Sequence, residues 1–290
     1  MNTDFFDEKL KRLLIEFLQN RTTKPSTIDP DVLAYRWVGG KLGHLQAMEV
    51  HFTHSLDDLL GIDTQKHKII ANTEQFLAGF PANHVLMTGA RGTGKSSIVR
   101  ALLHRYHKQG LRIIEVARED LLHLEKIRHT ILQHNPYHRY IIYCDDLAFS
   151  SQDESYRSLK SVLDGSLGSD QDRLLIYATS NRRHLLPQLM KDNQNIYNGQ
   201  TDEINPFEQI DETVSLSDRF GLWLSFYSID QQTYLDIVKN NLNKHHIILT
   251  DEAKASALRW ASERGGRSGR VAEQFARHYI GQKLLNDSIS

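Results

Sequence analysis

The most informative segment of this 290-residue chain reads Gly89-Ala90-Arg91-Gly92-Thr93-Gly94-Lys95-Ser96, and Ser97 follows it. It fits the pattern G-x-x-x-x-G-K-[ST] and lies between a short apolar run, His84 to Thr88, and a helical pattern, Ser96 to Lys108. Glycines let the backbone curl so that successive N–H groups point at phosphate oxygens, and a helix N-terminus adds the positive end of its dipole. Lys95 supplies a charge for the β- and γ-phosphates, and the Ser96 hydroxyl is a Mg²⁺ ligand. The segment Gly89 to Ser97 is therefore predicted to bind ATP; the alternative is a glycine-rich turn with an incidental lysine.

Further short apolar runs follow, and helical patterns lie between them. The runs are Arg112 to Ala117, Tyr140 to Cys144, Leu174 to Ala178 and Leu222 to Tyr227. They are rich in Ile, Leu, Val and Tyr with little polar alternation, as expected of strands that helices cover on both faces. The helical patterns are Asp120 to His134 and Ser155 to Leu167. This alternation predicts a three-layer α/β structure around a parallel sheet.

The two ends of the chain have a different, helical pattern. After Tyr227, helical segments are predicted over Asp230 to Asn243, Asp251 to Arg264 and Ser268 to Leu285. Near the N-terminus, residues 4–19 place apolar side chains at helical spacing, and residues 20–30 then break the pattern. We therefore expect an N-terminal helical extension over residues 1–54, an α/β core over 55–228 and a small helical lid over 229–290.

The composition predicts neither a membrane span nor an export signal. No window approaches the ~20 uninterrupted apolar residues of a membrane helix, and the N-terminus lacks a basic patch followed by an apolar stretch. The one cysteine, Cys144, cannot form an internal disulfide, which fits a reducing compartment. We expect a cytoplasmic protein with no membrane partner. The formal net charge of -1 provides no general attraction to nucleic acid.

An apolar strand that ends in two acids is the second element of the predicted site. The run Arg139 to Cys144 is followed by Asp145 and Asp146. A carboxylate at the end of a strand next to the strand His84 to Thr88 can reach a magnesium ion, usually through water, so Asp145 is predicted to be a metal ligand together with Ser96. Asp146 is predicted to polarise the attacking water. The alternative is a pair of solvated acids that cap a helix.

The order of these motifs resembles the AAA+ superfamily of P-loop ATPases over roughly residues 55 to 285. Tyr177 to Asn181 resembles its sensor 1 segment, Ser215 to Gly221 the segment that presents an arginine finger, and Gly265 to Arg270 its sensor 2. The resemblance implies an AAA+ core with a helical lid, binding of ATP and Mg²⁺, and roles at the γ-phosphate for Asn181, Arg219 and Arg270, with Arg267 in reserve. The superfamily commonly carries glutamate where this chain has Asp146, and the shorter side chain predicts slow hydrolysis or binding alone.

In AAA+ rings the finger arginine comes from the neighbouring subunit, so the resemblance also implies a homo-oligomer in which Arg219 acts in trans. The alternatives are that Arg219 pairs with Asp218, that Asn181 is a cap, and that Arg267 and Arg270 are solvated. More narrowly, several segments resemble a bacterial AAA+ family that is catalogued only as a domain of unknown function: Leu59 to Asp63, Gly89 to Ser97, Tyr143 to Leu147, Ala178 to Leu185 and Ser217 to Trp223.

These features leave two functions from different classes. The first is an ATPase that couples hydrolysis to the remodelling of an unidentified protein or nucleic acid. The second is an ATP-loaded switch or adaptor with little hydrolysis. A small-molecule kinase fits less well, because it usually places its lid within the core. The long segment Asn193 to Thr213 is a candidate partner contact. Metal binding by His51 and His54 is disfavoured, because no Cys or paired carboxylate nearby completes a coordination shell.

Overall fold

The computed structural model describes residues 28–40, 43–134, 137–149, 153–163, 173–181 and 218–289. These residues form a seven-stranded sheet with the strand order β2-β1-β4-β5-β6-β3-β7. The strands are β1 (Ala34–Val38), β2 (His44–Met48), β3 (Val85–Gly89), β4 (Leu111–Glu115), β5 (Arg139–Cys144), β6 (Leu174–Ser180) and β7 (Leu222–Phe226). Neighbouring strands are parallel except for β1 and β2, which form an antiparallel pair at one edge. The parallel sheet predicted from the apolar runs is confirmed.

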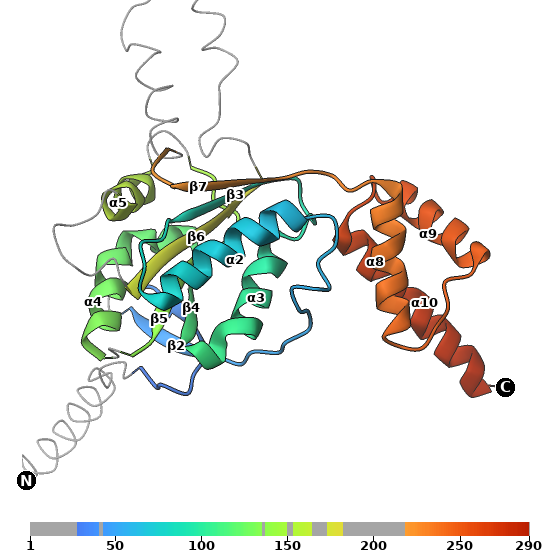
Figure 1. The fold of residues 1–290 in the computed structure, drawn as a ribbon, viewed down its shortest axis with the longest axis horizontal. Coiled ribbons are helices and arrows are strands. Elements are labelled where there is room, and N and C mark those ends of the chain that lie inside the picture. Colours follow the sequence, from blue (N-terminus) through green and yellow to red (C-terminus); the bar gives the residue numbers. More distant parts are fainter. Residues whose placement is uncertain are drawn as a thin grey trace, which may run out of the picture.

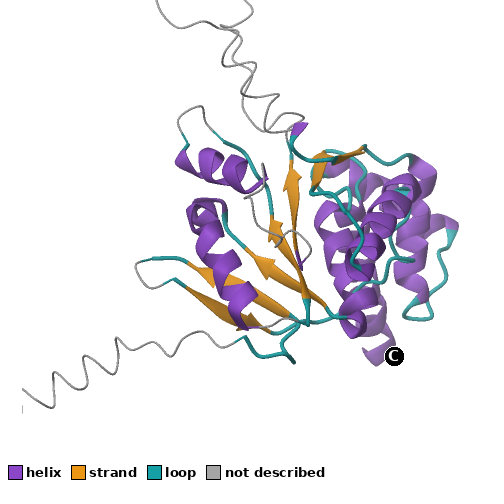
Figure 2. Cartoon of the chain, turned by 60° about the vertical axis from the view of Figure 1, so that its left-hand side comes forward, coloured by secondary structure: helices purple, strands orange, loops and turns teal. Residues whose placement is uncertain are grey.

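Helices cover both faces of the sheet, so the core has three layers (Figure 1, Figure 2). The helices on one face are α2 (Asp63–Ala78) and α3 (Lys95–Tyr106), and those on the other are the 3₁₀ helix η2 (Arg118–His123), α4 (Leu124–His134) and α5 (Glu154–Leu163). Strand β5 shows why the strands are apolar throughout: Ile141 packs on the side of α2 and α3, while Ile142 and Cys144 pack on the opposite side. Every position of β5 after Arg139 is buried, so polar alternation is absent.

A helical lid follows β7 and has an apolar core of its own. Its helices are α8 (Gln231–Asn243), α9 (Asp251–Glu263) and α10 (Gly269–Ile289), and they lie to one side of the sheet (Figure 1). Side chains such as Tyr234, Ala257 and Phe275 meet in the lid core. The Asp230 carboxylate accepts a hydrogen bond from the Thr233 N–H at 2.7 Å, which satisfies an N–H group that the start of α8 would otherwise leave unpaired. The three helices predicted after Tyr227 are confirmed.

The structure corrects two expectations and adds one element. Residues 34–48 form β1 and β2 inside the sheet, so the expectation of a helical extension over residues 1–54 is wrong for this part; its predicted helix, residues 4–19, lies outside the described residues. Strand β5 is not next to β3, because β6 lies between them. Helix α2 was not predicted, because its first six residues are polar and its apolar residues fall in two short clusters, 69–71 and 76–78, rather than in a stripe along its length.

None of the helices in the described part of the chain is both long and apolar enough to span a membrane.

Candidate nucleotide-binding site

The loop between β3 and α3 carries the predicted phosphate-binding segment. Its backbone needs glycine: Gly89, Gly92 and Gly94 have φ of 134°, 74° and 95°, which lie in the region that side chains with a Cβ disfavour. At Gly89 a Cβ would also lie 1.9 Å from the carbonyl oxygen of Phe226 in the adjacent strand β7. The loop therefore keeps its curled conformation only with glycine at this position.

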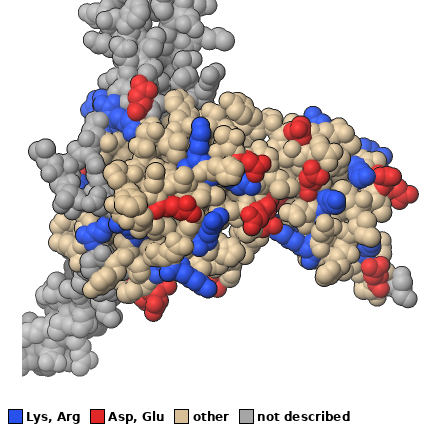
Figure 3. All heavy atoms as spheres, viewed as in Figure 1, with Lys and Arg blue, Asp and Glu red and all other residues tan. Residues whose placement is uncertain are grey.

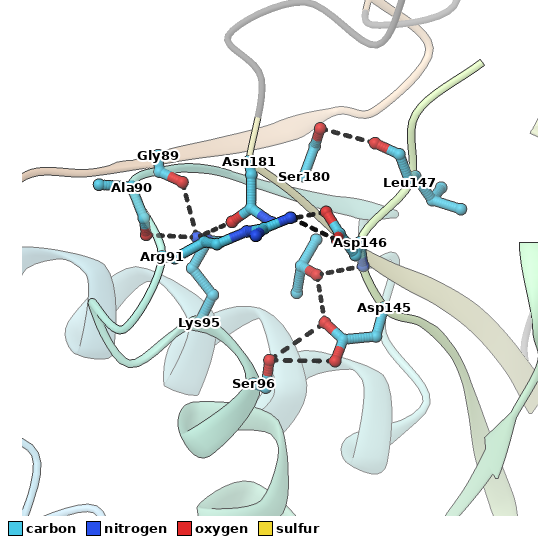
Figure 4. Close-up of polar contacts among 11 residues, drawn as sticks. Gly89, Ala90, Arg91, Lys95, Ser96, Asp145, Asp146, Leu147, Ser180 and Asn181 are labelled. Atoms are coloured by element: carbon cyan, nitrogen blue, oxygen red, sulfur yellow. Dashed lines mark hydrogen bonds and ion pairs between the residues drawn. The ribbon is translucent and has the colours of Figure 1, made fainter. Parts of the chain in front are cut away.

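Lys95 begins α3 and points back across the loop (Figure 4). Its Nζ donates to the carbonyl oxygens of Gly89 and Ala90, both at 2.7 Å, and to Oδ1 of Asn181 at 3.2 Å. Burial lowers the pKa of the Lys95 ammonium, and the carboxylates of Asp145 and Asp146 act in the opposite direction. A cation held by uncharged oxygens can exchange these partners for phosphate oxygens, which bind it more strongly.

Ser96 and Asp145 meet at the carboxyl ends of the strands. The Ser96 hydroxyl donates to the Asp145 carboxylate at 3.0 and 3.3 Å, and the Thr179 hydroxyl donates to the same carboxylate at 2.5 Å. Burial raises the pKa of the Asp145 carboxyl, but these hydrogen bonds outweigh burial and hold the pKa below its ordinary value. Asp145 is therefore an anion at neutral pH, with a hydroxyl oxygen beside it.

Asp146 contacts two other predicted site residues. Its backbone adopts φ of 53°, rare for a residue with a side chain, and its N–H donates to Thr179 Oγ1 at 2.9 Å. Its carboxylate accepts a hydrogen bond from Asn181 Nδ2 at 2.6 Å and lies 3.6 Å from the Arg91 guanidinium (Figure 4). Asn181 thus bridges Asp146 and Lys95 through the two ends of its amide.

These residues line a cavity of about 880 Å³ between the sheet and the lid. The predicted loop residues from Arg91 to Ser97 all line it, and Asp145, Asp146 and Asn181 do as well. The cavity is also lined by the segment from Glu49 to His54 and by the lid residues Ile229, Ile237 and Arg270. Of these, the sequence predicted only Arg270 as a site residue. The Gly269 N–H donates to the Gly92 carbonyl at 3.0 Å, which joins the start of α10 to the loop.

The arginines predicted for the γ-phosphate lie in different places. Arg270 lines the cavity, and its Cβ would lie 3.2 Å from a Cβ on Gly92. Arg267 does not line this cavity; its Nη1 lies 3.4 Å from Gln231 Oε1. Arg219 lies near the start of β7, where Leu222 pairs with Val85 at the opposite end of β3 from the loop. Arg219 is therefore not brought to the cavity of its own chain.

Thr179 is a site residue that sequence reasoning missed as a separate contributor. It holds Asp145 through its hydroxyl hydrogen and accepts the N–H of Asp146. The available signal was its position two residues before Asn181, which puts both side chains on one face of an extended chain. Arg182, Arg183 and the segment Asn193 to Thr213 lie outside the described residues.

The oxygen ligands present fit a magnesium ion. Ser96 Oγ and Asp145 Oδ1 are hard donors, and Mg²⁺ in nucleotide sites binds one or two protein oxygens while water and phosphates complete its shell. Within the described ranges no three His, Cys, Asp or Glu side chains gather as they would to hold a metal ion by themselves. His51 and His54 instead lie 3.5 Å from Glu49 and Glu273, respectively.

Comparison with known proteins identifies the fold and a family match. The family described as "Protein of unknown function (DUF815)" matches residues 30–283. A structure of the Thermotoga maritima RuvB Holliday junction branch migration motor is similar, with a TM-score of 0.54, 17% identity, and coverage of 81% of this chain and 67% of that chain. AMPPCP-bound DnaA from Aquifex aeolicus has a TM-score of 0.51, 17% identity, and coverage of 78% and 64%. No curated protein sequence matches significantly. At these identities the structures show the shared fold, which is the α/β P-loop fold of AAA+ proteins.

Proposed function

Because the chain belongs to the family described as "Protein of unknown function (DUF815)" and has an AAA+ fold, we propose that it is a cytoplasmic Mg²⁺-dependent ATPase. It binds ATP on the segment Gly89 to Ser97 and couples hydrolysis to the remodelling of an unidentified protein or nucleic acid. The observation that carries this proposal is that side chains from the start of α3 and from the ends of two strands converge on one cavity: Lys95, Ser96, Asp145, Asp146 and Asn181.

Each residue has a role that its contacts support. Lys95 and the loop N–H groups bind the β- and γ-phosphates, and Ser96 and Asp145 hold Mg²⁺, which neutralises charge that develops during phosphoryl transfer. Asp146 orients the attacking water and accepts its proton. Asn181, which already contacts Asp146 and Lys95, positions both groups against the γ-phosphate.

Two arginines complete the proposed site. Arg270 acts within its own chain, since it lines the cavity. Arg219 lies at the other end of the sheet, so it serves the site of a neighbouring copy. A homo-oligomer is then the active form. We propose a chain division into a core that includes β1 and β2 and ends at residue 228, and a lid over residues 229–290.

One observation favours the second candidate, an ATP-loaded switch with little hydrolysis. The short Asp146 carboxylate is held by Asn181 at 2.6 Å and lies 3.6 Å from Arg91. These contacts hold the short side chain in place, which favours nucleotide binding over fast hydrolysis. Slow turnover in the presence of tight ATP binding would identify the switch.

The first test separates binding from hydrolysis. ATP affinity is measured by calorimetry with Mg²⁺ or with EDTA, for the natural protein and for Lys95→Ala, with Lys108→Ala as the matched control. Loss of a charge-assisted bond to phosphate is worth about 1.5–3 kcal/mol, so Lys95→Ala is expected to weaken binding about tenfold to a hundredfold. Lys108 is exposed near the end of α3, and its removal is expected to change nothing. Equal affinities for all three proteins refute the proposed site.

The second test measures phosphate release over a series of protein concentrations. Activity per chain is expected to rise with concentration, and Arg219→Ala is expected to lower it about 10³-fold while ATP affinity is retained. Arg259→Ala, on the exposed surface of α9, is the matched control. If the natural protein binds ATP but releases no phosphate at any concentration, the switch replaces the hydrolase for the isolated chain.

A further inference from the structure

A second cavity of about 680 Å³ adjoins the nucleotide cavity, and both are lined by Arg91, Gly92 and Arg270. We call it the arginine pocket, because Arg91, Arg264, Arg267 and Arg270 line it. Arg91 comes from the phosphate-binding loop, and the other three come from the turn between α9 and α10 and the first residues of α10. Among the described residues that line the pocket, none is an aspartate or a glutamate.

Contacts at the rim hold these arginines and neutralise their charge only in part, because carboxylates pair with Arg264 and Arg91. Arg264 lies 3.5 Å from Glu263, and its guanidinium stacks 3.3 Å above the Trp260 ring. Arg267 reaches Gln231 at 3.4 Å, and Arg91 reaches Asp146 at 3.6 Å. Each guanidinium carries five N–H donors in a rigid fork, and these contacts use few of them. Four cations around one cavity therefore call for an anionic ligand that accepts several hydrogen bonds.

The chain itself contains an acidic stretch next to the proposed trans arginine. Residues 193–218 contain no Lys, Arg or His, and they contain six acids: Asp202, Glu203, Glu208, Asp211, Glu212 and Asp218. Asp218 is exposed and directly precedes Arg219. Consecutive Cα atoms are about 3.8 Å apart, so a copy that delivers Arg219 to a γ-phosphate also delivers Asp218 to the neighbourhood of that phosphate.

We propose that the arginine pocket receives carboxylates of this acidic stretch from a second copy of the chain, so that docking of the acids places Arg219 at the nucleotide. The proposal rests on the trans role proposed for Arg219. The pocket lies at the right place, because it shares the loop residues Arg91 and Gly92 with the nucleotide cavity. Asp218 of the same chain is an unsuitable occupant, since it lies with Arg219 at the other end of β3.

The charge distribution on one face of the molecule favours a local pairing over an extended electrostatic surface. On the face shown in Figure 3, positive and negative side chains are interspersed over the core and the lid. Nucleic acid is usually bound by a broad basic area, whereas carboxylates are bound by a few arginine forks. Assembly through exposed charges of this kind is also expected to weaken as salt is added.

The experiment exchanges the charges on the two surfaces of the full chain. Arg264→Glu alters the pocket, and the triple variant Asp211→Lys, Glu212→Lys and Asp218→Lys alters the acidic stretch. Arg259→Glu, on α9 outside the pocket, is the matched control. Assembly with ATP is followed by sedimentation velocity over a concentration series, and circular dichroism checks that each variant is folded. ATP affinity is measured separately at concentrations where the chains are monomeric.

The pocket variant and the triple variant are each expected to need at least tenfold more protein to assemble, and an equimolar mixture is expected to recover much of the loss. ATP affinity of Arg264→Glu is expected to stay unchanged. The proposal is overturned if the natural protein stays monomeric, if Arg264→Glu assembles like the control, or if the mixture recovers nothing. It is also overturned if Arg264→Glu loses binding of a DNA duplex while assembly is unchanged. Failure of the natural protein to bind ATP would instead refute the proposed function.

Discussion

His84 makes the stability of the core depend on pH. It directly precedes β3, the strand that leads into the predicted phosphate-binding loop, and its Nδ1 accepts a hydrogen bond from the Ile176 N–H in β6 at 3.0 Å. Burial lowers its pKa from 6.5 to about 4. The folded protein therefore holds His84 neutral at a pH where the unfolded chain has already bound a proton.

The sign and size of the effect follow from these two pKa values. Between pH 6.5 and about 4 the unfolded state binds more protons at this site, so the free energy of unfolding falls as the pH falls. The contribution is fully present above pH 6.5 and is lost as the pH approaches 4. At about 1.4 kcal/mol per pH unit, the full loss is about 3 kcal/mol. Part of the acid sensitivity of this protein is therefore expected to come from one partly buried imidazole.

The variant His84→Asn tests this expectation, because its side-chain oxygen can accept the Ile176 N–H but does not titrate. Urea unfolding is followed by tryptophan fluorescence at intervals from pH 7 to pH 4. Between these limits, the natural protein is expected to lose about 3 kcal/mol more than the variant. Carboxyl groups contribute equally to both proteins and cancel in the difference. Parallel stability curves for the two proteins would refute the reasoning.

Three further predictions concern the site. Gly89→Ala places a Cβ 1.9 Å from the Phe226 carbonyl oxygen at φ of +134°. We expect the free energy of unfolding to fall by about 3 kcal/mol or more, measured by thermal unfolding. An unchanged unfolding midpoint would contradict this close approach. Burial raises the pKa of the Cys144 thiol to about 12, so Ellman's reagent at pH 8 is expected to label it only after urea is added; rapid labelling of the native protein would show that the strand end is open. Asp146→Glu provides a longer carboxylate and is expected to raise steady-state phosphate release about tenfold or more at unchanged ATP affinity, whereas a decrease would refute the idea that the short side chain limits hydrolysis.

Local patterns were sufficient to predict the loop, the buried strands and the lid. The segment Gly89 to Ser96 has a backbone that only glycine allows at its turns. Its sequence pattern can therefore be recognised without knowing which other segments it contacts. Strands such as β5 are buried on both faces, which makes them continuous apolar runs. The cap at Asp230 likewise involves residues only three positions apart. Interactions over such short separations are encoded in neighbouring residues.

Edge strands and half-exposed helices were harder to predict. Strand β2 has only one buried position, Leu45, so it lacks an apolar run. Strand β2 is stabilised by its pairing with β1, and β1 by its pairing with β4, rather than by a strong local preference for the extended conformation. Similarly, α2 shows its buried side only when Ile69 and Phe76 are seen against the sheet. The register of these elements depends on partners far away in the chain.

The chemistry of the site depends on the same long-range pairing. The sequence was sufficient to predict several site residues, because each lies next to a buried strand or at the start of a helix. They are Lys95, Ser96, Asp145 and Asn181. Three other features were known only from the folded sheet. Thr179 donates a hydrogen bond to Asp145, Arg91 approaches Asp146, and β6 lies between β5 and β3. The sequence shows which side chains lie at the end of each strand. The order of the strands sets which groups meet, because strands can exchange places without any change in their own apolar patterns.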